Sequence, residues 1–479
     1  MGSRVIASFL FMLAISCEAH AQTYPTFSPP FNPAPPASAP GTKTCTSPQA
    51  FFTSDCPLSW YGVTVFGAID VGGGYQTHGV PLNDAIPTGV EELVSKNSNR
   101  SLFLPVPNGL SQSFLGIKVK EPLASDWSFI GELSFGFDPY TLTLADGPRS
   151  LLENNGIPLD RQTAAGDSSR GGQIYNSTGY FGLSNVNYGT LTFGRQNTLG
   201  LDGIIAYDPM GASYAFSPIG YSGAPAGGGD TETARSTTAL KYRVDIGLFR
   251  IGALYQVGGY DLDNGSKQEY NISAGATFPV WNYGTLAVDG IYSSNKGAVA
   301  SGILSPSQNL AYPGTLAATI SDNDSFMLLG KYSYKAIKLF AGYEKILYQN
   351  PSSPQLTSFI DISGIPTLSS NINNSAYNNQ KTLEVIWGGA RYALTDYLDV
   401  GAAYYRESQN SYYKKYCNNS SQSSCSGTLN AVSFDADWSV NKKFDVYAGV
   451  MYSGVLDGMA SGYLHRTNVD PTVGLRFRF

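Results

Sequence analysis

Segments in which apolar and polar residues alternate recur along this chain from Trp60 to its end. In a β-strand such alternation puts the apolar side chains on one face and the polar ones on the other. It predicts sixteen strands, at 62–75, 111–120, 127–137, 178–184, 189–196, 235–243, 247–257, 269–278, 284–293, 325–334, 337–345, 381–392, 397–407, 428–439, 443–454 and 469–479. Gaps of a few residues between them alternate with long gaps such as 76–110, 138–177 and 197–234.

The last predicted strand shows the pattern most clearly. Between Val473 and Phe479 the apolar residues occupy odd positions, and both arginines, Arg476 and Arg478, occupy even ones. A soluble β-sandwich could place such an apolar face on its core. A β-barrel that spans an outer membrane would instead turn that face to lipid and the arginines to its lumen.

Composition and loop lengths favour the barrel. Only 14% of the residues are charged, Tyr (32) and Phe (24) are abundant, and the mean hydropathy is −0.13. A membrane protein with that hydropathy must be a closed barrel, because a barrel pairs every backbone polar group and still leaves many side chains polar. Short turns that alternate with long loops are typical of even-stranded barrels, and a sandwich or propeller has no need of them. The sequence therefore predicts an all-β, 16-stranded antiparallel transmembrane β-barrel with short periplasmic turns and long external loops.

The N-terminal region predicts export from the cytoplasm. Residues 1–21 combine Arg4, an apolar run over 5–15 and a small-x-small site at 19–21, which is typical of a secretory signal peptide. A short membrane anchor and a lipoprotein modified at Cys17 are the alternatives. We expect 22–57 to be a proline-rich extension, because proline at this density disfavours sheet pairing, and 58–479 to be the barrel. The net charge of −6 argues against nucleic acid as a partner.

Four cysteines remain after the predicted signal peptide. Their grouping in the sequence favours two short disulfide loops, Cys45–Cys56 and Cys417–Cys425, in an oxidising compartment. A metal site is the competing interpretation. It is weakened because the nearest candidate histidine ligands, His78 and His465, are far from either pair in the sequence.

Several motifs give the chain a family resemblance. The run T-V-F-G-A-I-D at 64–70 resembles a first strand that often reads T-L-Y-G-V-I-D, and Y-G-T-L-T-F-G-R-Q at 188–196 precedes a long loop. That loop contains G-G-D-T at 228–231, and the chain ends in Phe479. With these motifs the chain, from about residue 58 onward, resembles the trimeric general porins of Gram-negative bacteria.

The resemblance implies a water-filled pore in the cell outer membrane, embedded in lipid and lipopolysaccharide and assembled as a homotrimer. It implies that the third external loop, 197–234, folds inward and narrows the pore. Phe479 would then be an assembly signal, and small hydrophilic solutes and ions would pass without any cofactor. The resemblance thus predicts a passive diffusion channel rather than an enzyme.

Charged residues near the narrowest point are expected to set a transverse field. The acidic side would comprise Glu132 on the wall and, in the third loop, Asp202, Asp208, Asp230 and Glu232. The basic side would comprise Lys118, Arg195, Arg235 and Lys241, with Lys120 and Arg243 also inward by strand parity. Alternation places Arg195 on the outward face with Phe193, so a bulge or the end of the strand must turn it inward. Relatives often carry Arg where Phe114 stands, so we expect a weaker field here.

Other functions are less compatible with the sequence. A hydrolase would need an activated nucleophile, usually beside a histidine base, and neither His78 nor His465 has such a neighbour in the sequence. A TonB-dependent transporter needs about 22 strands and a plug domain, for which 479 residues are too few. A substrate-specific outer-membrane channel remains the alternative, since long Tyr-rich loops would suit it.

Overall fold

The computed structural model describes residues 45, 47–54, 56–79, 101–140, 142, 144, 177–220, 234–257, 268–281, 284–302, 317–354, 359–362, 365–368 and 372–479. The predicted signal peptide, 1–21, and most of the proline-rich extension, 22–57, lie outside these residues and stay predictions. No helix in the described part of the chain is long and apolar enough to cross a membrane.

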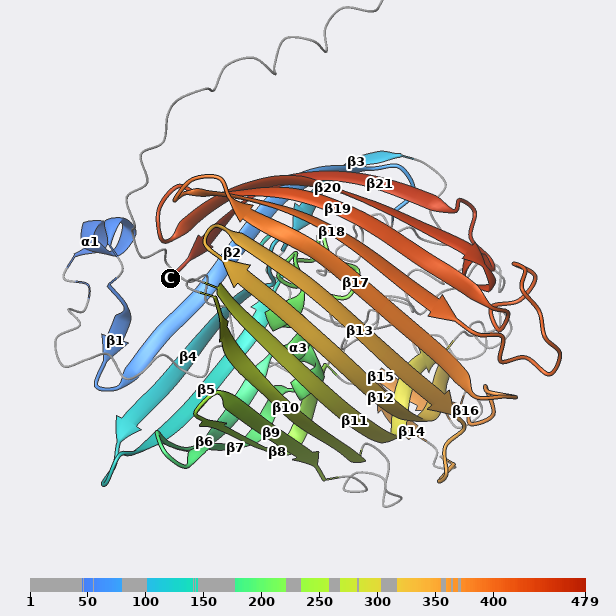
Figure 1. Cartoon of the computed structure of the whole chain (residues 1–479), viewed down its shortest axis with the longest axis horizontal. Coiled ribbons are helices and arrows are strands. Elements are labelled where there is room, and N and C mark those ends of the chain that lie inside the picture. The colour runs from blue at the N-terminus through green and yellow to red at the C-terminus, as the bar shows by residue number, and fades with distance from the viewer. Residues whose placement is uncertain are drawn as a thin grey trace, which may run out of the picture.

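Sixteen antiparallel strands form a closed barrel (Figure 1), as predicted. They are β2 (Val63–Gln76), β4 (Ser113–Pro122), β5 (Trp127–Phe137), β6 (Thr178–Asn185), β7 (Gly189–Asn197), β8 (Arg235–Ile246), β9 (Phe249–Gln256), β10 (Gln268–Val280), β11 (Gly284–Gly302), β12 (Ala317–Tyr334), β13 (Ile337–Gln349), β17 (Lys381–Ala393), β18 (Leu398–Gln409), β19 (Gly427–Ser439), β20 (Phe444–Asp457) and β21 (Thr467–Arg478). Each pairs with the next, and β21 pairs with β2 to close the ring.

Most strands lie within a few residues of the predicted segments, but one hairpin is much longer. Strand β11 continues to Gly302 and β12 begins at Ala317, and these two residues pair at the far end of the hairpin. Shorter elements that the sequence did not reveal are α1 (Pro48–Thr53), β1 (Leu58–Trp60), β3 (Leu102–Pro107), β14 (Phe359–Ile362), β15 (Ile365–Leu368), β16 (Ile372–Asn373) and the 3₁₀ turn η4 (Gly458–Ala460). Strand β3 pairs with the end of β2 and so extends the wall into the predicted loop 76–110.

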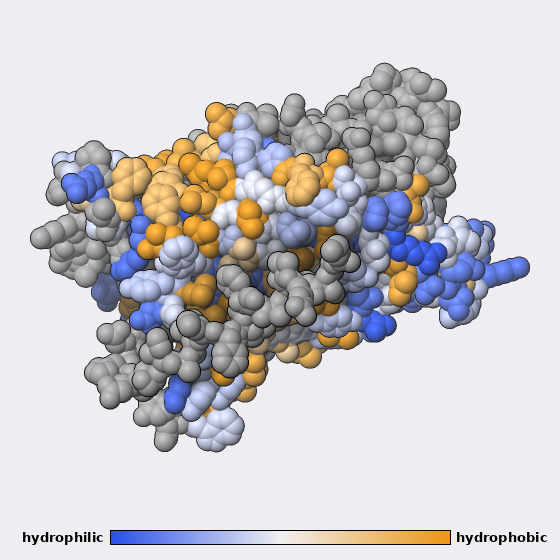
Figure 2. Space-filling view, turned by 90° about the horizontal axis from the view of Figure 1, so that it is seen from above, coloured by the Kyte–Doolittle hydropathy of each residue, from blue (hydrophilic) through white to orange (hydrophobic). Residues whose placement is uncertain are grey.

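Side chains alternate between the two faces of the wall. On β19, Phe434 is 55% exposed, whereas its neighbours Ser433 and Asp435 are buried. Many outward positions carry large apolar side chains. Figure 2 shows hydrophobic residues gathered on the wall between two ends where hydrophilic ones are more frequent. This alternation gives the barrel its lipid-compatible surface.

The chain end closes the barrel. The backbone N–H of Phe479 donates to the carbonyl of Gly67, and the N–H of Gly67 donates to the carbonyl of Phe479, both at 3.0 Å. The rings of Phe477 and Phe479 stack with centroids 5.5 Å apart. The last residue is thus part of the seam between the first and last strands.

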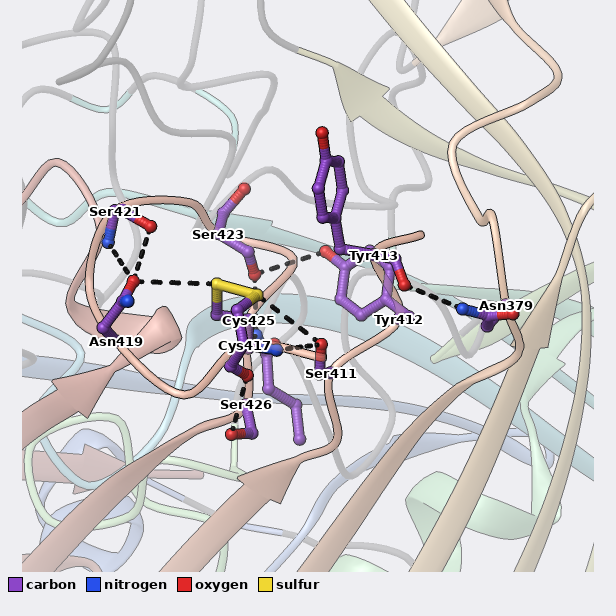
Figure 3. Close-up of a disulfide and its surroundings, with 11 residues drawn as sticks. Asn379, Ser411, Tyr412, Tyr413, Cys417, Asn419, Ser421, Ser423, Cys425 and Ser426 are labelled. Atoms are coloured by element: carbon purple, nitrogen blue, oxygen red, sulfur yellow. Dashed lines mark hydrogen bonds between the residues drawn. A yellow bond between two sulfur atoms is a disulfide. The ribbon is translucent and has the colours of Figure 1, made fainter. Parts of the chain in front are cut away.

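A small N-terminal module lies beside the end of that seam, where Figure 1 shows α1 next to the C-terminus. The Cys45–Cys56 disulfide brackets α1, whose Phe51 ring lies 6.0 Å from Phe477 and 6.2 Å from Phe479. The terminal aromatic rings therefore contact protein as well as facing outward. The second predicted disulfide, Cys417–Cys425, is also present (Figure 3), so both pairings are confirmed.

Candidate functional site

The described part of the loop between β7 and β8, residues 198–220, folds into the barrel, as predicted for the third loop. It begins with helix α3 (Leu199–Tyr207), capped by Thr198, whose hydroxyl accepts from the Leu201 N–H at 3.1 Å. The Thr198 N–H donates to the carbonyl of Ala234 at 3.1 Å, which holds the two ends of the loop together. Residues 221–233 of the loop, with Asp230 and Glu232, lie outside the described residues.

Apolar packing fixes the described part of the loop against the wall. A Cβ on Gly203 would lie only 2.6 Å from the Ile291 side chain and 2.8 Å from that of Leu329, so a larger residue here would have to displace these two side chains. Buried side chains from the loop and from inward positions of the wall form one cluster. Its bulkiest fully buried members are Leu199, Ile204, Phe216, Ile219, Tyr348, Trp387, Tyr405 and Tyr447. An apolar core therefore joins the described part of the loop to the inner wall.

Polar contacts hold the C-terminal end of α3, where helix carbonyls lack partners within the helix. The Lys331 ammonium donates to the carbonyl of Ala206, and the Trp387 indole N–H to that of Tyr207, both at 3.1 Å. Beyond the helix, the Arg391 guanidinium donates to the carbonyl of Pro209 at 3.1 Å. Two of these donors are cations, which also suits the negative end of the helix dipole.

Tyr207 connects the loop to an ion pair on the wall. The Arg250 guanidinium bonds Asp289 at 2.6 Å and the Tyr207 hydroxyl at 2.7 Å, and that hydroxyl donates to Asp289. Burial, together with the nearby Asp289 carboxylate, raises the pKa of the Tyr207 phenol. The phenol therefore stays protonated and keeps its donor.

Asp208, a predicted constriction acid, turns toward the loop itself. Its carboxylate accepts from the backbone N–H groups of Met210 at 3.2 Å and Ala212 at 2.8 Å, and from the Tyr405 hydroxyl at 2.5 Å. Burial raises the pKa of this carboxyl group. In these contacts Asp208 stabilises the turn after α3.

Asp202, another predicted constriction acid, meets the basic wall. Its carboxylate pairs with the Lys241 ammonium at 2.5 Å and with the Arg243 guanidinium. The Arg243 side chain is 37% exposed, whereas those of Lys241 and Asp202 are 10% exposed. Arg243 is therefore the member of this cluster most available to solutes.

Arg195 and Arg235 lie at the root of the same loop. The register between β7 and β8 shifts between Gly194 and Gln196, which confirms the bulge expected from strand parity. Gly194 has φ +126°, a conformation that residues with a side chain rarely adopt. Both arginines are nearly buried, at 8% and 7% exposure, so they face the loop base more than an open lumen.

Glu132 and Lys118 sit together on the neighbouring part of the wall, on β5 and β4. They are directly paired across β4 and β5. The Glu132 carboxylate accepts from the Thr178 hydroxyl at 2.8 Å and the Tyr180 hydroxyl at 3.3 Å, and the Lys118 ammonium lies 5.1 Å above the Phe66 ring. Strand parity predicts that both charges face the inside of the barrel.

A further charge network near the short turns was not singled out from the sequence. Arg391 bonds Asp399 at 2.8 Å and Asp435 at 3.1 Å, and Arg476 bonds Asp445 at 2.9 Å. One sign of this network in the sequence was that strand parity places Arg476, near the end of its strand, on the inward face. It could not reveal which acids these arginines meet.

Comparison with known proteins gives one family and one fold. The sequence profile of Gram-negative porins matches residues 7–457. No curated protein matches the chain. An OmpT structure from the outer membrane of Vibrio cholerae shares 14% identity, with a TM-score of 0.52 over 88% of this chain and 100% of that one.

Two further solved structures share the fold. A trimer form of Vibrio cholerae OmpT has 15% identity and a TM-score of 0.51, covering 87% of this chain and 99% of that one. The outer-membrane channel DcaP of Acinetobacter baumannii has 11% identity and a TM-score of 0.51, covering 88% of this chain and 99% of that one.

Proposed function

The chain belongs to the Gram-negative porin family and is an outer-membrane channel, and from this premise we propose that it lets small hydrophilic solutes and ions diffuse passively. The observation that carries the proposal is the third loop, which enters the closed barrel and is held there by Trp387, Lys331 and Arg391. A loop fixed in this way narrows the lumen permanently, without a catalytic step or a cofactor.

The charges around that loop would sort the solutes. Asp202 stands against Lys241 and Arg243, with Glu132 and Lys118 on the neighbouring wall. Charged rings at a constriction govern ion selectivity. We assign Arg195 and Arg235 to the basic side at the loop root, and Asp230 and Glu232 to the acidic side.

The assembled form would be a homotrimer. This is supported by the trimer form of the Vibrio cholerae relative, which shares the fold. We further propose that lipid and lipopolysaccharide surround the exposed wall and that Phe479 serves as an assembly signal.

A substrate-specific channel is the second candidate. It is favoured by the aromatic side chains that point inward, since Tyr348, Trp387 and Tyr405 are all fully buried on the lumen side. Trp387 and Tyr405 bind the third loop, however, so they are not a free track for solutes.

The decisive experiment is electrical. Purified protein in planar bilayers should give open, stepwise conductances, often in threes, and a salt gradient should give a reversal potential that reports ion selectivity. Folded protein that leaves the membrane closed at all voltages would refute the diffusion channel. Conductance that one class of solute blocks at low concentration would favour the substrate-specific alternative.

A further inference from the structure

Two lysines face the lumen from neighbouring strands near the short turns. Lys331 on β12 pairs with Phe340 of β13, and Lys338 stands two residues before Phe340. Both lysines are on the inward face, because Leu328 and Leu339, at outward positions of the same strands, are exposed. Diagonal neighbours on one face of a sheet have Cα atoms about 7–8 Å apart. One small solute can therefore contact both ammonium groups.

Neither ammonium forms an ion pair with a carboxylate in the described part of the chain. Lys338 also makes no hydrogen bond with a described residue. The Lys331 ammonium donates to the carbonyl of Ala206 at 3.1 Å and lies 5.3 Å from the centre of the Tyr207 ring. An ammonium has three donors, so both lysines keep N–H groups for a further acceptor.

The two lysines repel each other. Lys338 is the charged group that acts most strongly on Lys331. Like charges this close raise the free energy of the folded protein unless an anion lies between them. A bound anion would therefore remove a repulsion as well as accept hydrogen bonds.

Carboxylates on either side of the two lysines are already bound to arginines. On one side, Asp289 bonds Arg250 at 2.6 Å. On the other side, Arg391 lies directly opposite the second lysine, across β13 and β17. It bonds Asp399 at 2.8 Å and Asp435 at 3.1 Å. These acids therefore compensate arginines rather than the two ammonium groups.

The lumen is open to solvent at this level of the wall. Inward side chains close to the short turns are partly exposed, as is Lys338, and the exposed fraction is 32% for Arg250 and 34% for Asp399. Farther along β13, toward the long loops, the inward side chain of Tyr348 is fully buried instead. A solute that enters from the short-turn side can therefore reach the two lysines.

Lys331 and Lys338 are called the lysine pair below. Resting on the channel function proposed above, we propose that the lysine pair is a binding subsite for solutes that carry a phosphate or carboxylate group. The oxyanion would lie between the two ammonium groups and accept hydrogen bonds from both. The solute would move on through the lumen, because conduction requires binding that is weak enough to be released.

The chemistry of the lysine pair favours an oxyanion over other solutes. A phosphate or carboxylate oxygen accepts charge-assisted hydrogen bonds and brings the negative charge that the pair lacks. A cation would add a third positive charge. A neutral solute could accept hydrogen bonds but would leave the repulsion unchanged. Neither lysine is among the charges that the sequence predicted for the transverse field, so the subsite is distinct from that field.

The test uses inorganic phosphate with the whole protein. Calorimetry in detergent measures binding, and block of the current by phosphate from the short-turn side of a bilayer measures its effect on conduction. Lys338→Gln removes one charge of the lysine pair without breaking a described contact, so phosphate affinity should fall roughly tenfold. Dilute salt is used, because screening by concentrated salt weakens charge interactions at exposed sites.

Lys345→Gln is the matched control. Lys345 belongs to the same strand but lies at an outward position, as Leu339 does, so its loss should leave phosphate affinity unchanged. Equal phosphate affinity in wild type and Lys338→Gln, with both proteins folded, would overturn the subsite. An equal loss in Lys345→Gln would show a general charge effect and overturn it as well. Closed membranes would refute the diffusion channel alone, because calorimetry tests the subsite without conductance.

Discussion

At the residue scale, exposure decides which charges can act on a solute. Arg243 combines an ion pair to the inward loop with a side chain that is 37% exposed, whereas Arg195 and Arg235 are almost buried. A charge that reaches the water of the lumen can attract or repel a passing ion. A buried charge mainly holds the loop root in place.

This difference predicts an order of effects on selectivity. Arg243→Gln should raise cation over anion permeability more than Arg195→Gln does. Reversal potentials in a dilute salt gradient measure the change, and the effect should shrink in concentrated salt, because the screening length falls from ~10 Å at 0.1 M to ~3 Å at 1 M. A larger shift from Arg195→Gln would show that the exposed arginine is not the main selectivity charge.

Strand parity found inward residues but not their partners. It placed Lys118, Glu132, Lys241 and Arg243 in the lumen, because the face of a residue follows from its position in a strand. It could not predict that Asp208 would bind its own turn and Tyr405, since these contacts depend on the path of a loop without periodicity. Local alternation carries no information about such long-range contacts.

At the element scale, the inward helix α3 depends on partners from distant strands. The Trp387 indole N–H reaches the Tyr207 carbonyl from 180 residues away. Apolar positions on the inner wall have no role in a water-filled lumen, and here they pack against the loop. Apolar residues at inward positions of the strands are therefore the sequence pattern that indicates an inward-folded loop.

Trp387→Phe tests this anchor. The change keeps an aromatic ring but leaves the buried Tyr207 carbonyl without its donor, which should cost about 1–3 kcal/mol. We expect a lower thermal midpoint and noisier open-channel current. Trp438→Phe, on the exposed face of β19, is the control and should change neither. Identical melting and current noise in the two variants would argue against the anchor.

The bulge in β7 is a second element that can be tested. Gly194→Val places a branched side chain at φ +126°, where a Cβ would lie 2.3 Å from the carbonyl of Gly179. Strain of this kind costs on the order of 1–3 kcal/mol. Folded yield of the barrel in the membrane should fall. Gly131→Ala is the control, because its Cβ would have no neighbour nearer than 3.5 Å, and equal yields would contradict the strained bulge.

The sequence predicted the sixteen strands but not all their lengths. Residues 294–302 and 317–324 extend the hairpin of β11 and β12, yet they are rich in Ala, Ser and Gly and lack strong apolar contrast. Strand β3 contains two prolines, which also argued against a strand. Pairing with an existing strand overrides these weak local signals.

At the scale of the whole molecule, the barrel is completed where its two ends meet. Phe479 exchanges two backbone hydrogen bonds with Gly67, and its ring contacts the rings of Phe477 and of Phe51 in the N-terminal module. A closed ring leaves no unpaired strand edge. Closure of the whole barrel therefore depends on the hydrogen bonds of this seam.

Removal of Phe479 should weaken this seam. The deletion loses both backbone hydrogen bonds, at about 1 kcal/mol each, and the ring contacts that attach α1. We expect less folded barrel in the outer membrane, measured as the band that migrates differently before and after heating. Arg478→Ser is the control, because the buried Asp445 that it bonds keeps Arg476 as a partner at 2.9 Å. Equal folded yields from the two variants would contradict a specific role of Phe479 in closing the barrel.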